Sequence, residues 1–414
     1  MTYGLIGEKL GHSFSKLIHE RLTGIPYELL ELQPDRLGEF LQKGEFRGIN
    51  VTIPYKQAVI PYLDSLAPSA ELTGAVNVIV RSADGRLTGH NTDLDGVLAM
   101  AAHAGVSFSG ASVVIIGAGG ASKAVAAAAR SAGARKLVFA VRHDFGPERL
   151  PVGNPEAFAD CEVLINATPV GMYPGDDGKP LDISALPNLR GVLDCVYNPI
   201  RTELVLDALE RGIAAEGGLM MLVAQAVRAS ELFLDRSYEP GVADDLYRWL
   251  LRGRRNIVLC GMPSCGKSTV GQALAGRLGM QFADTDDLIR SDSGMEIPDI
   301  FAREGEAGFR KRERSAIQSL ASGHGMVVAT GGGAVLDPSN VRALRRNGLI
   351  VFLDRPPELL QPTDDRPLSR DRAALERLYA QRLPAYIAAA DARIPNDGPL
   401  SDTLESIISH ALQG

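Results

Sequence analysis

The sequence has 414 residues, of which 45% are hydrophobic and 22% are charged. This length predicts two or three domains, and this composition is typical of globular chains with sizeable apolar cores. The net charge of −7 argues against a nucleic-acid partner, because nucleic-acid-binding domains usually present a basic face. We expect no membrane span, since no segment has about 18 consecutive apolar residues, and no signal peptide, since the N-terminus lacks an apolar core.

The four cysteines form no C-x-x-C pair, and none lies beside a histidine at metal-ligand spacing. Cys161, Cys195 and Cys260 lie in or beside apolar, strand-like runs, and Cys265 lies in a glycine-containing stretch. This pattern favours buried, reduced thiols, so we expect a cytoplasmic protein.

Short apolar runs rich in β-branched residues recur along the chain, each followed by a glycine-containing turn and a helical stretch. This alternation predicts βαβ units, that is, parallel sheets with helices on both faces. The runs are continuously apolar rather than alternating, as is typical of buried parallel strands. They lie within segments 112–133, 136–143, 161–169, 190–197, 254–278, 325–333 and 347–354.

Before the first of these runs, polar clusters interrupt otherwise apolar sequence at residues 11–16 (GHSFSK), 50–56 (NVTIPYK), 74–77 (GAVN) and 89–96 (GHNTDLDG). The clusters follow strand-like runs, where open α/β sheets place their ligands. Hydroxyl and amide groups of this kind suit a polyhydroxylated substrate.

The segment SVVIIGAGGASKAV reads as strand, tight turn and helix, which is the context of a dinucleotide site. Gly117 allows the sharp turn, Gly119 allows the backbone to approach a pyrophosphate, and Ala121 or Ser122 takes the packing position. The helix N-terminus then faces the phosphates. The alternative is a turn that needs glycine for packing only.

The next strand ends at Arg142, followed by His143 and Asp144. An arginine here suits a 2′-phosphate and therefore favours NADP, whereas an acidic residue would bind a ribose hydroxyl and favour NAD. Asp144 lies close enough to leave NAD open, and Arg142 could also be a solvated surface charge.

A second glycine loop, G-x-x-x-x-G-K-S from Gly261 to Ser268, follows an apolar strand and opens a helix. Its backbone amides form an anion-binding nest for a β-phosphate. Lys267 reaches the β- and γ-phosphates, and Ser268 offers a hydroxyl to Mg²⁺. The nucleotide site therefore comprises Ser264, Cys265, Gly266, Lys267, Ser268 and Thr269.

About the first 235 residues resemble the shikimate dehydrogenase family. One shared motif could arise by chance, but an ordered series is far more specific. The motifs, in the order of the family, are GHSFSK, NVTIPYK, GAVN, NTD, GAGGAS, NATPVGM, DCVYNP and GGLMMLVAQA.

This resemblance implies roles for individual residues. Lys56 and Asp93 match the catalytic pair, in which the lysine supplies a proton and positive charge to the alkoxide that develops during ketone reduction. Without the family they read as a surface lysine and a helix N-cap. Ser13 and Ser15 match the ligands of the substrate carboxylate. The remaining matches are the substrate ligands Thr52, Asn77, Tyr197 and Gln225, and the cofactor contacts Gly117, Ala118, Gly119, Gly120, Ala121, Arg142, Gly218 and Cys195.

Residues 256–395 resemble shikimate kinase through FADTDDLI, FAREGEAGFRKRE, ATGGGAV, DRPLS and QRLPAY. The resemblance implies that Asp284 helps to place Mg²⁺ and that Asp286 accepts from the substrate hydroxyl and acts as base. Phosphoryl transfer depends mainly on alignment and charge neutralisation. The other implied roles are carboxylate binding by Arg310 and Arg382, a backbone amide from Gly332, and charge stabilisation by Arg366 on a lid.

Three stretches depart from these families. Lys16 stands where proline is common, which adds charge near the substrate carboxylate. The lid stretch PELLQPTDDRPLS is short and acidic and lacks an upstream arginine, which affects the expected ATP affinity and lid closure. The segment IPNDGPL matches the adenine-side loop loosely, so we assign no adenine contact to it.

The sequence therefore predicts an α/β protein with a dehydrogenase-like substrate domain, a Rossmann NADP domain and a P-loop kinase domain. We expect the substrate domain at 1–100 with helices 219–236 packing back on it, the Rossmann domain at 101–240, a linker at 241–254 and the kinase at 255–414.

The expected activities are NADPH-dependent reduction of 3-dehydroshikimate and phosphorylation of shikimate by MgATP, in a monomer or homodimer with no nucleic-acid or membrane partner. One alternative is a quinate/shikimate dehydrogenase with relaxed cofactor choice fused to a different kinase. The other is a non-catalytic regulator, which would have to lack catalytic residues that this chain retains.

Overall fold

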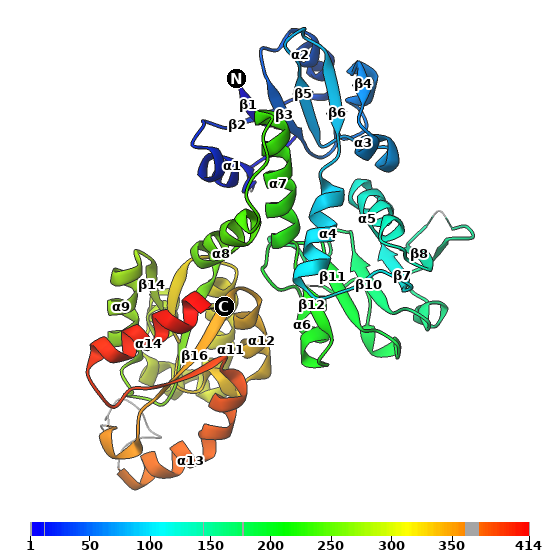
Figure 1. The fold of residues 1–414 in the computed structure, drawn as a ribbon. Coiled ribbons are helices and arrows are strands. Elements are labelled where there is room, and N and C mark those ends of the chain that lie inside the picture. Colours follow the sequence, from blue (N-terminus) through cyan, green and yellow to red (C-terminus); the bar gives the residue numbers. More distant parts are fainter. Residues whose placement is uncertain (1, 12, 144, 176–177, 361–371, 414) are drawn as a thin grey trace. The chain divides into compact units, whose positions relative to one another are not determined.

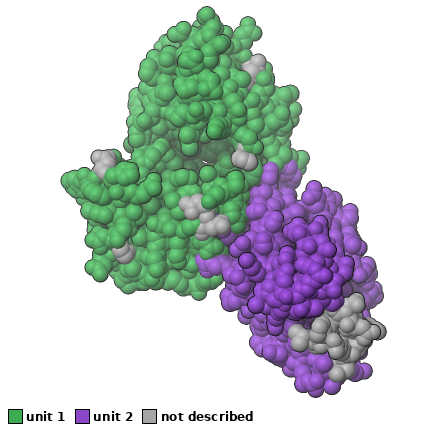
Figure 2. Space-filling view, turned by 180° about the vertical axis from the view of Figure 1, so that it is seen from behind, with its two compact units in different colours: residues 1–247 green, residues 248–414 purple. Residues whose placement is uncertain are grey.

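A computed structural model describes residues 2–11, 13–143, 145–175, 178–360 and 372–413. The chain divides into two compact units, Met1–Tyr247 and Arg248–Gly414 (Figure 2). Both units consist of sheets covered by helices, so the predicted α/β fold class is confirmed. None of the helices in the described part of the chain is long and apolar enough to cross a membrane.

The first sheet of unit 1 has six strands in the order β2-β1-β3-β5-β6-β4. It is mixed rather than parallel, because β5 runs antiparallel to both β3 and β6. Residues 82–86 form a short turn between these strands, closed by a 3.0 Å bond from the Ser82 amide to the Arg86 carbonyl, and a short turn can only join antiparallel strands. The elements of this lobe are β1 (Tyr3–Gly7), α1 (Ser15–Thr23), β2 (Glu28–Glu31), α2 (Leu37–Lys43), β3 (Gly48–Val51), β4 (Ser65–Leu66), α3 (Pro68–Thr73), β5 (Val78–Arg81) and β6 (Leu87–His90).

The second sheet of unit 1 is parallel, as predicted, with the order β12-β11-β10-β7-β8-β9. Its central strands are buried along their whole length, which explains why they read as continuous apolar runs. The elements are α4 (Asp93–His103), β7 (Ser112–Ile116), α5 (Gly120–Ser131), β8 (Lys136–Val141), β9 (Arg149–Pro151), β10 (Val163–Asn166), β11 (Gly191–Asp194), α6 (Glu203–Glu210) and β12 (Ala214–Glu216).

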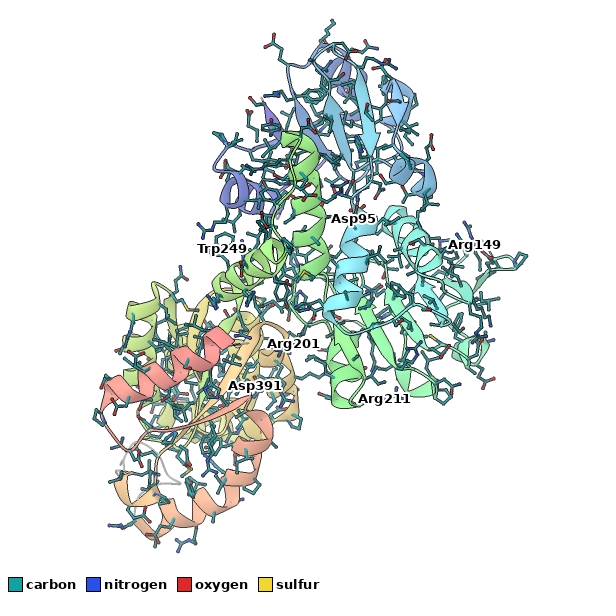
Figure 3. All side chains as sticks on the ribbon, in the orientation of Figure 1. Asp95, Arg149, Arg201, Arg211, Trp249 and Asp391 are labelled. Atoms are coloured by element: carbon teal, nitrogen blue, oxygen red, sulfur yellow. The ribbon has the colours of Figure 1, made fainter. Side chains whose placement is uncertain are left out.

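Helices α4 and α7 (Leu219–Leu234) lie side by side between the two sheets of unit 1 (Figure 1). Gly96 allows this close approach, because a Cβ there would lie 2.6 Å from the Met221 carbonyl oxygen. At the far end of α7, Phe233 stacks on Tyr3 with ring centroids 5.4 Å apart. Helix α7 therefore packs on the first sheet. Asp95 of α4 lies near helix α7 (Figure 3).

Unit 2 is a single parallel sheet of five strands in the order β14-β15-β13-β16-β17. Strand β13, which precedes the second glycine loop, is central and fully buried. The elements are β13 (Asn256–Cys260), α9 (Lys267–Leu278), β14 (Gln281–Asp284), α10 (Thr285–Ser293), α11 (Ile297–Ala321), β15 (Met326–Ala329), α12 (Pro338–Asn347), β16 (Gly348–Asp354), α13 (Arg372–Ala389), β17 (Ala392–Pro395) and α14 (Leu400–Gln413).

Most of the segment predicted as a linker, 241–254, is helical, because α8 spans Val242–Arg254 and carries Trp249 (Figure 3). Its apolar residues Leu246, Leu250 and Leu251 recur at helical spacing and are buried, a signal that the Pro, Gly and Arg residues around them obscured. Within unit 1, Tyr247 donates to Glu216 Oε1 at 3.2 Å. Within unit 2, the Gly325 amide donates to the Arg254 carbonyl at 3.1 Å.

Candidate active sites

The structure brings the predicted pair Lys56 and Asp93 together. Lys56 lies in the turn after β3, Asp93 is the first residue of α4, and Lys56 Nζ lies 2.6 Å from Asp93 Oδ2. The other carboxylate oxygen, Oδ1, accepts from Asn77 Nδ2 at 2.9 Å. The side chains of Lys56 and Asp93 are 20% and 8% exposed, so the charges face each other in a largely dry environment that strengthens their interaction.

Backbone pairing explains how residues from three segments meet here. Asn77 directly precedes β5, and its carbonyl accepts from the Val51 amide of β3 at 2.8 Å. Its side-chain Oδ1 accepts from the Thr92 amide at 2.8 Å, which fixes the start of α4. Lys56 is held in turn by the Val76 amide, which donates to its carbonyl at 2.7 Å. Asn77 therefore connects both members of the pair.

The other predicted substrate residues come from several loops and from α7. The Ser15 amide donates to Ser13 Oγ at 3.3 Å, and Phe14 between them lies 5.3 Å, ring to ring, from Tyr197. Thr52 lies beside β1, because a Cβ at Gly7 would lie 2.6 Å from its methyl group. Gln225 faces α4 from α7, with its Cβ 3.3 Å from the position that a Cβ of Gly96 would take. Lys16 points away to pair with Glu20 at 3.8 Å.

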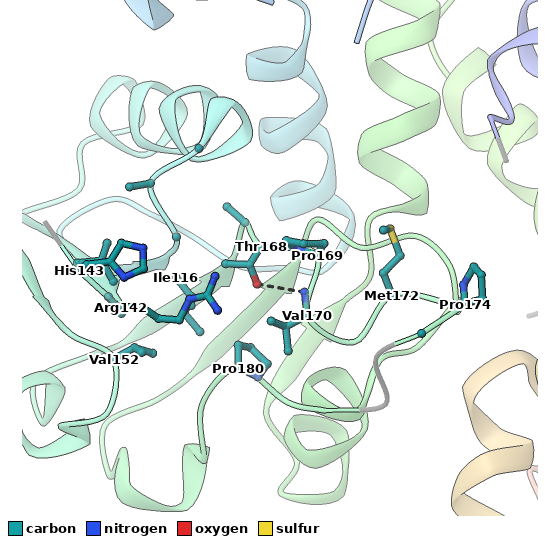
Figure 4. A pocket seen from close by; sticks show the side chains of 17 residues that line it. Ile116, Arg142, His143, Val152, Thr168, Pro169, Val170, Met172, Pro174 and Pro180 are labelled. Carbon is teal, nitrogen blue, oxygen red and sulfur yellow. Dashed lines mark hydrogen bonds between the residues drawn. The ribbon is translucent and has the colours of Figure 1, made fainter. Parts of the chain in front are cut away.

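A cavity of about 760 Å³ opens beside the first glycine loop (Figure 4). The backbone of Gly117, Ala118 and Gly119 forms one wall, and Arg142 and His143 lie at the end of β8 (Figure 4). Its described lining includes no Asp or Glu. Its other lining residues are Ile116, Ala140, Val141, Val152, Ala167, Thr168, Pro169, Val170, Met172, Pro174, Gly175 and Pro180.

This cavity has the size and chemistry expected for part of a dinucleotide. Gly117 adopts φ 101°, and a Cβ there would lie 2.7 Å from the Thr168 methyl, so the tight turn requires glycine. Gly119 caps α5, which places a helix N-terminus and its free amides at the cavity. Gly120 and Ala121 form the first turn of that helix and do not line the cavity.

Cys195 and Gly218, the predicted nicotinamide contacts, lie together outside this cavity. A Cβ on Gly218 would lie 2.3 Å from the Cys195 carbonyl oxygen. Burial raises the pKa of the Cys195 thiol, with a smaller contribution from the negative charges of Asp194 and Asp93, so Cys195 lies near the Lys56–Asp93 pair. All four cysteines are free thiols, and Cys195 is half-buried whereas the other three are buried.

In unit 2, the loop from Gly261 to Ser268 closes tightly around the end of β13. Lys267 Nζ donates back to the carbonyls of Gly261 and Met262 at 3.1 and 2.8 Å, and its side chain is buried. Ser264, a non-glycine residue, takes a positive φ of 63° within the loop. Gly266 is the N-cap of α9, so the loop ends at a helix N-terminus, which is a favourable place for an anion. Cys265 precedes this cap and Thr269 lies in the first turn of the helix.

The predicted metal residues Ser268 and Asp284 meet directly, because Ser268 Oγ donates to Asp284 Oδ2 at 2.7 Å. The second oxygen of Asp284 accepts from the Asp286 amide at 2.9 Å and caps α10. In the described residues, no three His, Cys, Asp or Glu side chains gather at a metal site. One hydroxyl beside one carboxylate suits Mg²⁺, which usually keeps waters and phosphate oxygens as its other ligands.

A second cluster forms where residues 331–333 pass α11 and α13. Arg382 Nη1 donates to the Gly332 carbonyl at 2.9 Å. A Cβ on Gly333 would lie 2.7 Å from Arg310 Nη1, and one on Gly331 would lie 3.1 Å from Asp286 Oδ1. The glycine run therefore brings together the two arginines and the carboxylate predicted to bind substrate. Gly332 uses its carbonyl in this contact, whereas the sequence predicted a role for its amide.

Sequence reasoning missed Glu313, whose side chain is 1% exposed and accepts from Arg310 Nη1 at 2.7 Å. Burial raises the pKa of Glu313, and the charge of Arg310 opposes that shift. The run EGEAGFRKRER resembles a solvated surface helix, so its pattern gave no signal that this one carboxylate turns inward. Arg366, predicted on the lid, lies outside the described residues.

Comparisons with known proteins identify the two families that the sequence motifs predicted, one in each part of the chain. Residues 5–79 match the family model of the shikimate dehydrogenase substrate binding domain, and residues 263–412 match the shikimate kinase model. Shikimate dehydrogenase (NADP(+)) from Clostridium perfringens is 35% identical over 266 residues, which cover 59% of this chain and 97% of that protein.

Solved structures give the same result for unit 1. Shikimate dehydrogenase 1 from Peptoclostridium difficile has a TM-score of 0.55 and 33% identity, covering 60% of this chain and 98% of that one. The Thermus thermophilus enzyme in complex with NADP(H) and shikimate has a TM-score of 0.53 and 30% identity, covering 60% and 99%. The chain belongs to the shikimate dehydrogenase family, and its C-terminal unit is a shikimate kinase domain.

Proposed function

We propose that unit 1 reduces 3-dehydroshikimate to shikimate at the Lys56–Asp93 pair. Bound NADPH supplies the hydride. Lys56 Nζ gives a proton to the ketone oxygen as negative charge develops there, and Asp93 orients the lysine. The main support for this role is the 2.6 Å ion pair that Asn77 fixes from the other side.

The surrounding side chains supply the substrate contacts in this proposal. Ser13 and Ser15 bind the carboxylate, and Thr52, Asn77, Tyr197 and Gln225 contact the ring substituents and the carboxylate. The closeness of Phe14 to Tyr197 supports a shared pocket, because it links the serine loop to the loop after β11. When NADPH is bound, Gly218 and Cys195 would lie beside the nicotinamide, and Gly117 to Ala121 with Arg142 would hold the phosphates.

We propose NADP as the preferred dinucleotide. Arg142 lines the cavity at the end of β8, where the 2′-position of the adenosine ribose lies in Rossmann folds. Asp144, which left NAD open in the sequence, lies outside the described residues. The Clostridium and Thermus relatives are described with NADP, in agreement with this choice.

For unit 2 we propose phosphorylation of shikimate by MgATP. Residues 264–269 cradle the phosphates, and Ser268 with Asp284 holds Mg²⁺ directly or through water. Asp286 accepts the proton of the attacking hydroxyl, while Arg310 and Arg382 bind the carboxylate beside Gly332. Arg366 is proposed to stabilise charge on the transferring phosphoryl group.

The two activities share one metabolite, since the product of unit 1 is the substrate of unit 2. Neither the quinate alternative nor the regulator is favoured by the comparisons, and Lys56, Asp93, Lys267 and Asp286 are all present. The four free cysteines support the proposal of a reducing, cytoplasmic location. We further propose functional divisions at 1–100, 101–240 and 255–414, and a monomer or homodimer.

A coupled assay on the purified full chain tests this proposal. The chain receives 3-dehydroshikimate and MgATP with either NADPH or NADH, and shikimate 3-phosphate is measured by mass spectrometry. We expect product with NADPH, and much less with NADH. Absence of shikimate would refute the assignment of unit 1, and accumulation of shikimate without its phosphate would refute that of unit 2.

A further inference from the structure

Asp194, which has no role in the reactions described above, is fully buried at the end of β11. Its Oδ1 accepts from Asn166 Nδ2 at 2.9 Å and from the Val196 amide at 2.9 Å. Its Oδ2 accepts from Thr202 Oγ1 at 2.7 Å. A buried carboxylate is costly to maintain in an apolar core, so three matched donors around it call for a physical reason.

On one side, Asp194 holds the loop that lines the cofactor cavity. Asn166 ends β10, and its Oδ1 accepts from the amide and the hydroxyl of Thr168 at 3.0 and 2.7 Å. Thr168 Oγ1 in turn accepts from the Val170 amide at 3.3 Å (Figure 4). The Thr168 methyl also supports the sharp turn at Gly117. Residues 167–170 are therefore fixed to Asp194 through a single side chain.

On the other side, the same oxygen holds the loop that approaches the reacting centre. The Val196 amide bonds to Asp194, and the Val196 carbonyl accepts from the Gly218 amide at 2.9 Å. Cys195 and Tyr197 flank Val196, and Cys195 lies near the charges of Asp93 and Lys56. Residues 195–197 and Gly218 are thereby held to one another and to Asp194.

We propose that Asp194 is a positioning residue for the reductase reaction, because one carboxylate oxygen anchors both the phosphate-side loop 167–170 and the nicotinamide-side loop 195–197. This inference rests on the proposed NADPH-dependent reduction. Hydride transfer depends steeply on the distance between donor and acceptor carbons. A shared anchor makes the two loops move as one body, so a cofactor held by the first loop meets the ketone beside the second.

Asp194→Asn is a conservative variant that distinguishes a positioning role of this residue from a role in folding. Asp194→Asn can keep Oδ1 and both loop bonds, and loses only the acceptor for Thr202. Asp194→Ala loses both loop bonds. We expect Asp194→Ala to lower kcat about 100-fold and to change the ketone KM by less than about threefold. Asp194→Asn should restore kcat to within about fivefold of the wild-type value.

Two further measurements on the full chain report on positioning directly. The primary isotope effect on kcat, measured with 4-deuterated NADPH, should increase in Asp194→Ala, because hydride transfer becomes slower than product release. NADPH affinity, measured by cofactor fluorescence without substrate, should weaken by less than the loss in kcat. A purely structural role would lower the amount of active protein and leave the isotope effect unchanged.

Ser112→Ala is the matched control, because Ser112 is a fully buried polar residue at the opposite end of the same sheet. It loses one bond, to Asp160 at 3.3 Å, and should keep the wild-type kcat and isotope effect. If Asp194→Ala does not fold, the Asn166→Ala variant tests the inference instead. It keeps the Asp194 carboxylate but removes the side chain that joins this carboxylate to loop 167–170. We expect Asn166→Ala to lose at least about tenfold in kcat with an increased isotope effect.

A wild-type isotope effect and kcat in the folded Ala variants would overturn the inference, as would an Asp194→Asn chain as slow as Asp194→Ala. Failure of both Ala variants to fold would assign the network to stability alone. If the unsubstituted chain binds NADPH but reduces no 3-dehydroshikimate, the proposed function fails instead, and the kinase rate of each preparation shows whether the chain is intact.

Discussion

The two lysines that we propose act in catalysis lie in opposite electrostatic settings. Lys56 of unit 1 is paired with a carboxylate at 2.6 Å and remains partly exposed. Lys267 of unit 2 is buried and donates to two carbonyls of its own loop, with no carboxylate among its recorded partners. The difference agrees with the proposed chemistry, in which one lysine exchanges a proton and the other supplies a fixed charge to phosphate.

The arginines of unit 2 extend this contrast. Arg310 Nη1 donates to Glu313 and Arg382 Nη1 donates to the Gly332 carbonyl, and each guanidinium has further N–H groups for the carboxylate that we propose it binds. In unit 1 the Lys56–Asp93 pair is already formed. One direct ion pair therefore organises the first site, whereas internal acceptors hold the two arginines of the second.

The largest expected effect is that of Lys56→Ala on ketone reduction. Loss of the general acid should lower kcat by about 10²–10⁴-fold, while shikimate phosphorylation by the same chain stays normal. NADPH oxidation and ADP release measure the two rates. Lys136→Ala, which removes an exposed lysine paired with Asp160 in unit 1, is the control and should leave both rates unchanged. Loss of both activities in Lys56→Ala would contradict the independence of the units.

Lys267→Ala should produce the converse result. Removing a preorganised charge from the developing phosphoryl transition state should lower the kinase kcat by about 10²–10³-fold and leave ketone reduction intact. Arg312→Ala is the matched control, because that arginine pairs with Glu304 on the surface of unit 2. Retained kinase activity in Lys267→Ala would remove the lysine from its assigned phosphate contact.

Glu313→Gln tests whether unit 2 depends on a buried acceptor for Arg310. We expect the KM for shikimate to rise about tenfold with the KM for ATP unchanged, because the guanidinium loses a charge-assisted bond that orients it. Initial rates at fixed MgATP and varied shikimate measure this change. A lower KM for shikimate would mean that Glu313 competes with the substrate for Arg310 rather than aligning it.

The smallest expected effect is an acid sensitivity of unit 1. His19 stacks on Tyr27 at 4.3 Å, and complete burial lowers its pKa to about 3. Because the folded state binds this proton less tightly than the unfolded state, stability is lost as pH falls from the unfolded pKa of about 6.5 towards 3. From pH 7 to 6 the loss should be about 0.7 kcal/mol.

Hydrogen exchange in β1, compared between the wild type and His19→Gln at both pH values, measures this loss. The variant lacks the titrating group, so its change in stability with pH should be flatter by that amount. His324 of unit 2 is only partly buried, so a smaller acid effect is expected there. An equal pH response in the wild type and the variant would show that the pKa of His19 does not differ between the folded and unfolded states.

Sequence reasoning predicted the parts of the fold that depend on residues close together in the chain. The nucleotide loop from Gly261 to Ser268 is a continuous strand, turn and helix, and the turn at Gly117 has the same form, so short-range pattern predicted both. Helix α8 was missed because Pro240, Gly241 and its arginines suggested a linker, while the burial of Leu246 and Leu250 arises only in the folded chain.

By itself, the sequence determined the fold class and the two glycine loops, because these depend on composition, period and local motif. The side chains that we propose act in catalysis were identified through ordered motifs shared with known families. Tertiary structure alone decided which charges meet: Lys56 with Asp93 across 37 positions, Arg310 with a buried Glu313, and Asp194 between two loops. Partner choice and burial depend on strand order and helix packing, and these arise only when distant segments share one core.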